Sequence, residues 1–325
     1  MSERRRVQAL PSYVEPMRAT LVREPFDDPD WLFETKWDGF RVEALVGGGR
    51  VEIWTRGQQD ASRYFGRFLE PPTWIKARRA IVDGEVVAFD GKGEPDFALL
   101  QQRIRQRTEP PADHRLVYEV FDLLELDGES LLERPLEERT TRLREILRDD
   151  PRVRYSDHVV GRGREAFAAA QERGLEGIVA KDRHSPYLPG RRSDRWRKIK
   201  VRPEQELIVG GWTRGTGYAA ELAALLVGVH EDGELRYVGK VGSGFDTASR
   251  LELLAALQPL ASDKPPFSPP PKVRGSDLTW VEPRLVIRAE FAGWTGDGKV
   301  RQAAFKGIDR GKDPRKVIRE RPADL

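Results

Sequence analysis

Short strand-like segments with few helices between them constrain the fold of this 325-residue chain more than any other feature. Residues 51–55, 81–89 and 116–126 have the alternating or continuously apolar pattern of strands. Helical spacing is confined to a few stretches, such as 136–147 and the alanine-rich segment 165–173 before Gly174. There is no βαβ rhythm, and no G-x-G-x-x-G motif follows a strand. The pattern predicts an α+β fold with antiparallel sheets and not a dinucleotide-binding fold.

A second series of short strand-like segments begins near Pro203. We expect five strands and one helix in it, at 206–209, 222–230, 235–241, 278–281 and 285–291 for the strands and 251–260 for the helix. Residues 231–234 have the composition of a hairpin turn, and the proline-rich stretch 264–271 excludes regular structure. This pattern predicts a small Greek-key β-barrel of the OB kind, and a β-sandwich is the open alternative. The expected domains are 1–203 and 204–325.

The basic residues are clustered, although the formal net charge of the chain is only +3. Segment 191–202 has one acid, Asp194, and seven basic residues, which are Arg191, Arg192, Arg195, Arg197, Lys198, Lys200 and Arg202. Such a cluster can neutralise phosphates, but a charge run taken alone is more often a solvated surface. The absence of cysteine excludes disulfides and thiolate zinc sites. The sequence also has no apolar run of about 18 residues, which excludes a membrane-spanning helix.

Segment 34–41 has the residue types that a lysine nucleophile needs. Lys36 follows the apolar residues 31–33, and a lysine loses its proton more easily near apolar groups or other cations. Gly39 would permit a tight approach of the backbone behind the lysine, and Arg41 offers a planar fork for a phosphate. The K-x-D-G pattern alone is a weak signal, because an ordinary Asp-Gly turn explains it equally well.

Two further segments carry candidate residues at strand edges. Glu85, in Asp83-Gly84-Glu85, could hold a metal ion or a ribose hydroxyl, or it is an exposed turn carboxylate. Phe121 could stack on a purine, although an aromatic residue in an apolar strand usually belongs to the core.

The last two segments combine an acid with lysines. Glu176 leads into a short strand that ends at Lys181. Lys198 and Lys200 are two residues apart, so in a strand both ammonium groups point to the same face and can converge on one phosphate. The alternative is a solvated strand, but the tryptophan and isoleucine of this segment, Trp196 and Ile199, favour a buried opposite face.

Six motifs, taken in their order along the chain, resemble the signature of the covalent nucleotidyltransferases. This superfamily includes ATP-dependent DNA ligases, RNA ligases and mRNA capping enzymes. The six motifs are K-x-D-G-x-R from Lys36, T-R-G at 55–57, D-G-E at 83–85, Y-x-x-F-D-L-L at 118–124, E-G-I-V-A-K at 176–181 and W-R-K-I-K at 196–200. Any one motif can arise by chance, but six in sequence cannot reasonably do so. The amino-acid sequences of segments 16–21, 185–191, 238–242 and 305–307 resemble those of one group within this superfamily, the bacterial ATP-dependent DNA ligases of the ligase D type. The resemblance extends from about Pro16 to Arg319.

The resemblance implies an adenylation domain at 1–203, an OB domain at 204–325 and a DNA ligase that carries AMP on Lys36. It implies that Lys198 and Lys200 neutralise the α-phosphate of ATP. It further implies nucleotide-binding roles for a set of side chains, which are Glu34 on the adenine N6 amine, Phe121 on the ring, Arg56 near the ribose, and Glu85, Arg41, Lys181 and Lys312. Glu176 and Glu85 would hold Mg²⁺ or Mn²⁺. Arg41 would grip the 5′-phosphate of the nick, and Arg191, Arg192 and Arg195 would contact DNA.

One motif departs from the family pattern. The last motif usually reads R-x-D-K after F-K-G-L, whereas this chain has Asp309-Arg310-Gly311-Lys312. Only Lys312 matches, so the efficiency of the ATP-dependent step is in question. Arg310 is the candidate to replace the missing arginine.

The resemblance also implies partners and a setting. The substrate would be nicked or broken double-stranded DNA, with Ku as a partner protein in non-homologous end joining. The enzyme would be a monomer in the bacterial cytoplasm, at the nucleoid, with no membrane association. No residues are left over for the polymerase-primase and nuclease that are often fused to this unit. The alternatives are an RNA ligase or capping guanylyltransferase, and a non-catalytic OB module. An NAD-dependent ligase is disfavoured because its cysteine zinc module has no counterpart here.

Overall fold

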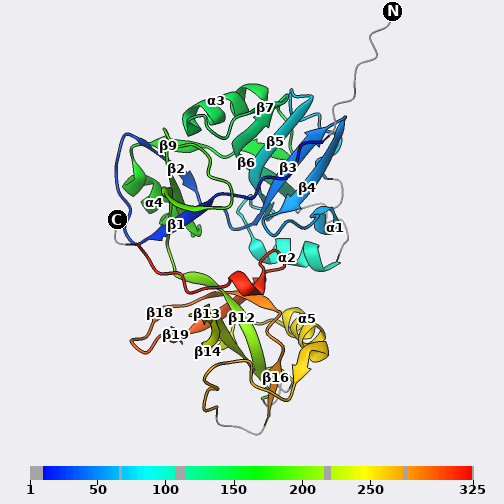
Figure 1. The fold of residues 1–325 in the computed structure, drawn as a ribbon, viewed down its shortest axis with the longest axis vertical. Coiled ribbons are helices and arrows are strands. Elements are labelled where there is room, and N and C mark those ends of the chain that lie inside the picture. The colour runs from blue at the N-terminus through cyan, green and yellow to red at the C-terminus, as the bar shows by residue number, and fades with distance from the viewer. Residues whose placement is uncertain (1–9, 66–67, 107–114, 216–220, 274–276, 324–325) are drawn as a thin grey trace, which may run out of the picture. The chain divides into compact units, whose positions relative to one another are not determined.

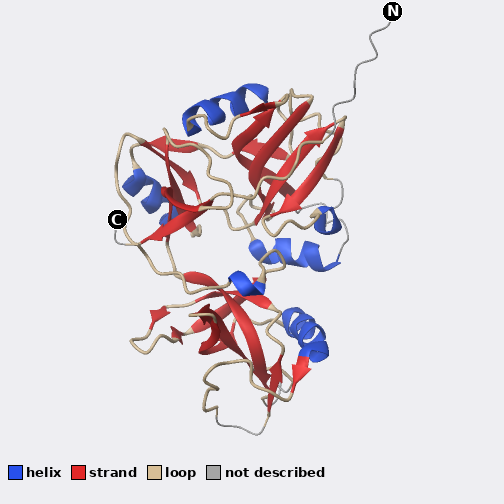
Figure 2. Ribbon diagram, in the orientation of Figure 1, coloured by secondary structure: helices blue, strands red, loops and turns tan. Residues whose placement is uncertain are grey.

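The chain folds into two compact units, seen in a computed structural model that describes residues 10–65, 68–106, 115–215, 221–273 and 277–323. Unit 1 comprises Met1–Val201 with Pro322–Leu325, and unit 2 comprises Arg202–Arg321 (Figure 1). Strands dominate both units, and helices are few (Figure 2). Among the described residues, no helix has the length and apolar character needed to cross a membrane.

The first sheet of unit 1 has five strands in the order β1-β11-β10-β2-β9. Their bounds are β1 Arg18–Val22, β11 Arg192–Lys200, β10 Gly177–Asp182, β2 Trp31–Thr35 and β9 His158–Val160. β1 and β11 are parallel, and the other neighbours are antiparallel. Helix α4 (Gly163–Glu172) covers one face of this sheet, where its Ala170 joins a cluster with Phe33, Ile178 and Ile199.

The second sheet of unit 1 follows the order β4-β3-β5-β6-β7, with β8 paired in parallel to β6. The strands are β3 Phe40–Gly47, β4 Arg50–Thr55, β5 Arg79–Phe89, β6 Arg115–Leu126, β7 Glu129–Ser130 and β8 Val153–Tyr155. One face packs with residues of α1 (Ser62–Phe65), α2 (Phe97–Gln106) and α3 (Leu136–Ile146). On the other face, Leu45, Ile81 and Leu124 share a cluster with Trp196 of β11. The two sheets therefore meet face to face, and the polar residues of the candidate site lie on these facing surfaces.

Unit 2 is a closed β-barrel. Its five strands are β12 Glu204–Thr213, β13 Ala224–Glu231, β14 Glu234–Ser243, β17 Val286–Glu290 and β20 Ala303–Ile308. They are neighbours in the order β13-β14-β20-β17-β12, and β12 also pairs with β13, which closes the circle. The remaining elements are β15 Ala261–Ser262, β16 Leu278–Val281, β18 Gly293–Trp294, β19 Val300–Arg301, helix α5 Thr247–Leu257 and the 3₁₀ turns Gln258–Leu260 and Pro314–Lys316.

The predicted fold class is confirmed. Antiparallel sheets with few helices form unit 1, and unit 2 is an OB-like barrel, so the sandwich alternative is wrong. The hairpin turn is also confirmed, because Asp232 and Gly233 join β13 to β14 with φ of 52° and 81°. Both angles are the positive values that a tight primed turn requires.

Two expected elements differ clearly in extent, and one strand was not expected. Helix α5 begins at Thr247 and not at 251, because Asp246 and Ser249 form a capping box that extends the helix toward its N-terminus. The strand expected at 206–209 spans Glu204–Thr213, since its far end pairs with both β13 and β16. Strand β20 has no counterpart among the expected strands.

Candidate active site

Strand alternation on the first sheet sorts its residues into an apolar face and a polar face. Phe33, Ile178 and Ile199 point toward α4. The residues between them therefore point the other way, toward the second sheet. The pairing register brings Glu34 beside Val179 and Val179 beside Lys198, so residues of three strands share this polar face. The other members of that face include Lys181 and Lys200.

Lys36 lies directly after β2, where its backbone N–H donates to the carbonyl of Gly177 at 2.9 Å. Its Nζ lies 2.5 Å from Glu176 Oε2, and Nζ of Lys200 lies 3.6 Å from Oε1 of the same carboxylate. The side chain of Glu176 is 6% exposed, whereas that of Lys36 is 20% exposed. Lys36 and Glu176 are 140 positions apart in the sequence, yet the fold brings them into contact beside Lys200. Lys198 lies on the same strand face as Lys200.

Two glycines allow the backbone to pass close to its neighbours at this point. A Cβ on Gly39 would lie 2.4 Å from the carbonyl oxygen of Val86. A Cβ on Gly177 would lie 2.1 Å from the carbonyl oxygen of Ile199, and Gly177 has φ of +152°. Real Cβ atoms do not approach so closely, so both positions require glycine. The close approach predicted for Gly39 is confirmed.

Glu34 and Lys181 form a second, more deeply buried pair beside this cluster. Nζ of Lys181 lies 2.8 Å from Glu34 Oε2, and the two side chains are 2% and 3% exposed. Burial raises the pKa of Glu34 to about 7, and Lys181 opposes this shift. The Lys181 ammonium also lies over two rings, 4.1 Å from the centroid of Phe121 and 4.3 Å from that of Trp196. Phe121 is half-buried, so it is neither fully in the core nor free of it.

Arg41 is held inside the protein rather than extended toward solvent. Its Nε and Nη2 bond the two oxygens of Asp83 at 3.1 and 2.7 Å, and Nη1 donates to the carbonyl of Met17 at 2.7 Å. Asp83 is fully buried and also accepts from the Tyr187 hydroxyl at 2.8 Å. These contacts use much of the guanidinium fork that the sequence suggests for a phosphate. The phosphate role of Arg41 stays a prediction.

The other predicted residues are spread more widely. Glu85 pairs in register with Arg41 on β3 and with Glu119 on β6, on the face toward the first sheet. Arg56 follows β4, and its carbonyl accepts from the Tyr13 hydroxyl. In unit 2, Nζ of Lys312 lies 3.6 Å from Oε1 of Glu206.

Two of the arginines predicted to bind DNA have partners within unit 1. Arg195 pairs with Asp182 at 2.5 Å and is 59% exposed. Arg192 donates to the carbonyl of Ala19 at 2.5 Å and is exposed. Arg191 is exposed at the start of the same basic segment.

The altered motif is anchored within unit 2. Asp309, which follows β20, accepts a hydrogen bond from the backbone N–H of Gly311 at 2.9 Å. Arg310 forms an ion pair with Glu252 of α5. Arg310 and Lys312 therefore both contact carboxylates of their own unit.

A group of buried acids is absent from the residues predicted by sequence. Glu43, Asp83, Glu119 and Asp122 are each 0% exposed, and all lie on β3, β5 and β6. Three of them have arginine partners, which are Arg41 for Asp83, Arg154 for Glu119 and Arg139 for Asp122. The available signal was an acid within a strongly apolar strand, because such an acid is usually buried with a partner.

The acidic residues fit a divalent ion only together with a ligand. In the described part of the chain, no three His, Cys, Asp or Glu side chains are grouped as a metal-binding set. Glu176 and Glu85 supply hard oxygen ligands, and Mg²⁺ is commonly held by one or two carboxylates plus the phosphates of a substrate. The site thus fits a metal ion that is bound mainly by phosphate oxygens and water.

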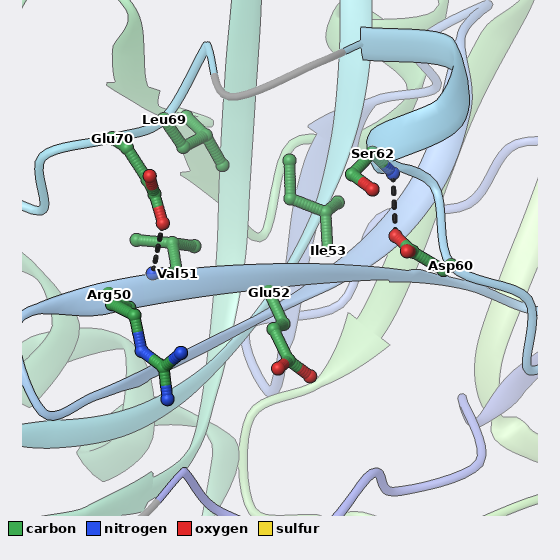
Figure 3. Close-up of a pocket in the computed structure, with 8 residues that line it drawn as sticks. All are labelled: Arg50, Val51, Glu52, Ile53, Asp60, Ser62, Leu69 and Glu70. Atoms are coloured by element: carbon green, nitrogen blue, oxygen red, sulfur yellow. Dashed lines mark hydrogen bonds between the residues drawn. The ribbon is translucent and has the colours of Figure 1, made fainter.

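A separate cavity of about 310 Å³ lies along β4 and is lined by residues that include Ile53, Asp60 and Glu70 (Figure 3). Within its lining, Glu70 accepts from the backbone of Val51, and Asp60 accepts from that of Ser62. None of the candidate residues lines it. The cavity is therefore not the site described above.

This chain is similar in sequence to known DNA ligases. The family model described as ATP dependent DNA ligase domain matches residues 12–200, and that described as ATP dependent DNA ligase C terminal region matches 218–312. The multifunctional non-homologous end joining protein LigD of Pseudomonas aeruginosa is 35% identical over 97% of this chain and 37% of its own length. A DNA ligase of Thermococcus fumicolans is 33% identical over 80% of this chain and 47% of its own length.

Solved structures are similar as well. A mycobacterial DNA ligase D complexed with ATP and MES has a TM-score of 0.66 and 31% identity, over 94% of this chain and 98% of that one. The chain spans only 37% of the length of the curated LigD proteins, so it is similar to one part of them.

Proposed function

This chain belongs to the ATP-dependent DNA ligase family, and from that premise we propose that it seals breaks in double-stranded DNA through a covalent lysyl-AMP intermediate on Lys36. The observation that carries the proposal is that Lys36 and Lys200 both contact the carboxylate of Glu176. These are the nucleophile, the acid and one lysine of the motif series. The relatives that match this chain are DNA ligases and end-joining proteins, which favours DNA over RNA or a capping substrate.

The reaction has three displacements at phosphorus. The Lys36 amine attacks the α-phosphorus of ATP, loses its proton, and pyrophosphate leaves. An oxygen of the DNA 5′-phosphate then attacks the AMP phosphorus and displaces the lysine. Finally the 3′-hydroxyl attacks the 5′-phosphorus, loses its proton, and AMP leaves. In each step the protein contributes position and charge neutralisation.

The lysines contribute most of that positive charge. Lys200 lies 3.6 Å from the carboxylate that also holds Lys36, so its ammonium can reach a phosphate attached to Lys36. Lys198, on the same face, is assigned the same task. On the base side, we assign Glu34 to the adenine amine, Phe121 to the ring and Arg56 to the ribose. Lys312 is assigned to the ATP phosphates.

Mg²⁺ or Mn²⁺ would be held by Glu176 and Glu85 together with phosphate oxygens, and would offset the charge of the triphosphate. Arg41 is assigned to the 5′-phosphate of the nick, which requires its guanidinium to share its contacts with Asp83. Arg191, Arg192 and Arg195 are assigned to the DNA backbone.

We assign residues 1–203 to adenylation and 204–325 to an OB domain. The pathway we propose is bacterial non-homologous end joining with Ku, in the cytoplasm at the nucleoid, with the chain acting as a monomer. The support for this pathway is the likeness to LigD proteins.

The test is labelling with α-³²P-ATP. Wild-type protein should form a labelled adduct, and Lys36→Ala should not, because it lacks the attacking amine. Lys92→Ala, which removes an exposed lysine in a turn, is the matched control and should label normally. Lys36→Ala should still seal a nick that is supplied already adenylated. Normal labelling of Lys36→Ala would refute the assignment, and preferential sealing of nicked RNA or labelling by GTP would favour the RNA ligase or capping alternative.

A further inference from the structure

The Glu34–Lys181 pair lies deeper in the protein than the residues of the proposed phosphate chemistry. Lys181 lies on β10, two residues beyond Val179, and Val179 pairs in register with Glu34 on β2. Their charged atoms are 2.8 Å apart, and at most 3% of either side chain is exposed. Lysine is almost never buried to this extent without a partner. The rings of Phe121 and Trp196, with centroids 4.1 and 4.3 Å from Nζ, provide electron-rich faces that favour the charged ammonium.

The carboxylate of Glu34 is only half used by this pair. Oε2 is the oxygen next to Lys181, whereas Oε1 is buried and has no hydrogen-bond partner in the described part of the chain. A buried acceptor without a partner is unfavourable, so a ligand that donates a hydrogen bond to Oε1 would gain affinity. An ionised carboxylate can only accept, but a protonated one can also donate. The protonation state of Glu34 therefore decides which ligand groups suit it.

Charged groups from several strands bear on that protonation state. Asp122 of β6 and Asp83 of β5 disfavour the anion, and each has its own arginine, Arg139 and Arg41. Tyr155 at the end of β8 bonds His158 of β9 at 3.1 Å, and His158 pairs in register with Glu34. Burial lowers the pKa of His158, so it provides little positive charge at neutral pH. Lys181 is therefore the main cation at the Glu34 carboxylate.

We propose that Lys181 is a positioning residue that keeps Glu34 ionised, and that the pair thereby selects a purine with a 6-amino group over one with a 6-oxo group. Adenine presents an N–H donor at this position and a 6-oxopurine presents an acceptor, so only the former matches a carboxylate oxygen. This inference rests on the proposed function, in which Glu34 faces the base of the bound nucleotide. Lys181 then acts through Glu34 and need not touch the nucleotide itself.

The test compares covalent labelling by ATP and by inosine triphosphate, which differs at the 6 position, from pH 6 to 9. The ratio of the two rates cancels the ionisation of Lys36, because both nucleotides use the same nucleophile. In wild type the ATP-to-ITP ratio should rise with pH through about 7, where the pKa of Glu34 lies. In Lys181→Met the anion is less favoured, so the rise should move to higher pH and the ratio at pH 7 should fall by about tenfold or more.

Three further variants keep the test decisive. Lys181→Arg retains the positive charge and should restore much of the wild-type ratio. Glu34→Gln carries an amide that both donates and accepts, so its ratio should be low and independent of pH. In the double variant Glu34→Gln/Lys181→Met no charge is buried without a partner, and its ratio should equal that of Glu34→Gln. The double variant therefore serves if Lys181→Met alone fails to fold.

The outcomes separate this inference from the proposed function. If wild-type protein is labelled by neither nucleotide, both fall. If wild type is labelled but Lys181→Met slows ATP and ITP equally, with the same pH profile for the ratio, Lys181 is only structural and this inference alone is overturned. A ratio that differs between Glu34→Gln and the double variant would also overturn it, because Lys181 would then act independently of Glu34.

Discussion

Arg139→Met should strongly destabilise unit 1, because it removes the partner of a fully buried acid. Nε and Nη2 of Arg139 bond Asp122 at 2.7 and 2.8 Å, and both side chains are 0% exposed. Nη1 also donates to the carbonyls of Arg134 and Ser185 at 2.6 and 3.0 Å. These bonds tie α3 to β6, next to Phe121 of the candidate site.

The expected loss follows from that burial. Removing one member of a buried ion pair leaves an uncompensated charge and costs about 3–5 kcal/mol. For a domain of roughly 200 residues, each kcal/mol lowers Tm by about 2–4 °C, so the expected fall is about 6–20 °C. Scanning calorimetry of the full chain measures this directly.

Arg144→Met is the matched control, since it makes the same substitution on the same helix. Arg144 pairs with Asp157 at 2.7 Å, but these side chains are 51% and 87% exposed. A surface pair is worth about 0–1 kcal/mol, so Tm should fall by less than about 4 °C. The double variant Arg139→Met/Asp122→Leu should recover much of the loss, because it buries no unpaired charge. Equal Tm values for Arg139→Met and Arg144→Met would refute the reasoning.

Three other predictions concern single charged residues. Burial, with Asp83 nearby, raises the pKa of Glu43 to about 9, so the ionisation of Glu43 opposes folding increasingly from about pH 4.5 to 9. The Tm of Glu43→Gln should therefore rise relative to that of wild type as the pH rises through this range. A difference in Tm that does not depend on pH would contradict this. Lys200→Ala should slow self-adenylation by about 10²–10³ with Tm nearly unchanged, and near wild-type single-turnover rates would mean that it is only a strand residue. Arg310→Ala should slow self-adenylation but not the sealing of pre-adenylated nicks, and equal slowing of both steps would exclude a role confined to ATP.

The motifs and the fold class were accessible from the sequence because both depend on local patterns. Alternation along a strand determines which residues share a face, so the common face of Lys198 and Lys200 follows from their spacing alone. Asp232-Gly233 specifies its own turn in the same way. The nucleophile segment and its glycine were likewise readable, since close backbone approach leaves no room for a side chain at Gly39.

The sequence could not say which charged groups would be each other's partners. Lys36 meets Glu176 across 140 positions because β2 pairs with β10 in the first sheet, and Asp83 holds Arg41 because β5 pairs with β3 in the second. The full length of β12 and the existence of β20 were equally inaccessible, since both depend on pairing with distant strands.

Burial is the second property that only the tertiary structure decided. The position of Lys181 at the end of a short strand does not indicate burial, yet its side chain lies in the interior with Glu34. Side-chain type and spacing are local, whereas desolvation and ion pairing depend on every element packed around a group. The sequence therefore determined which chemical groups this protein carries, whereas strand pairing determined their partners and the packing of the elements around them determined how deeply Glu34 and Lys181 are buried.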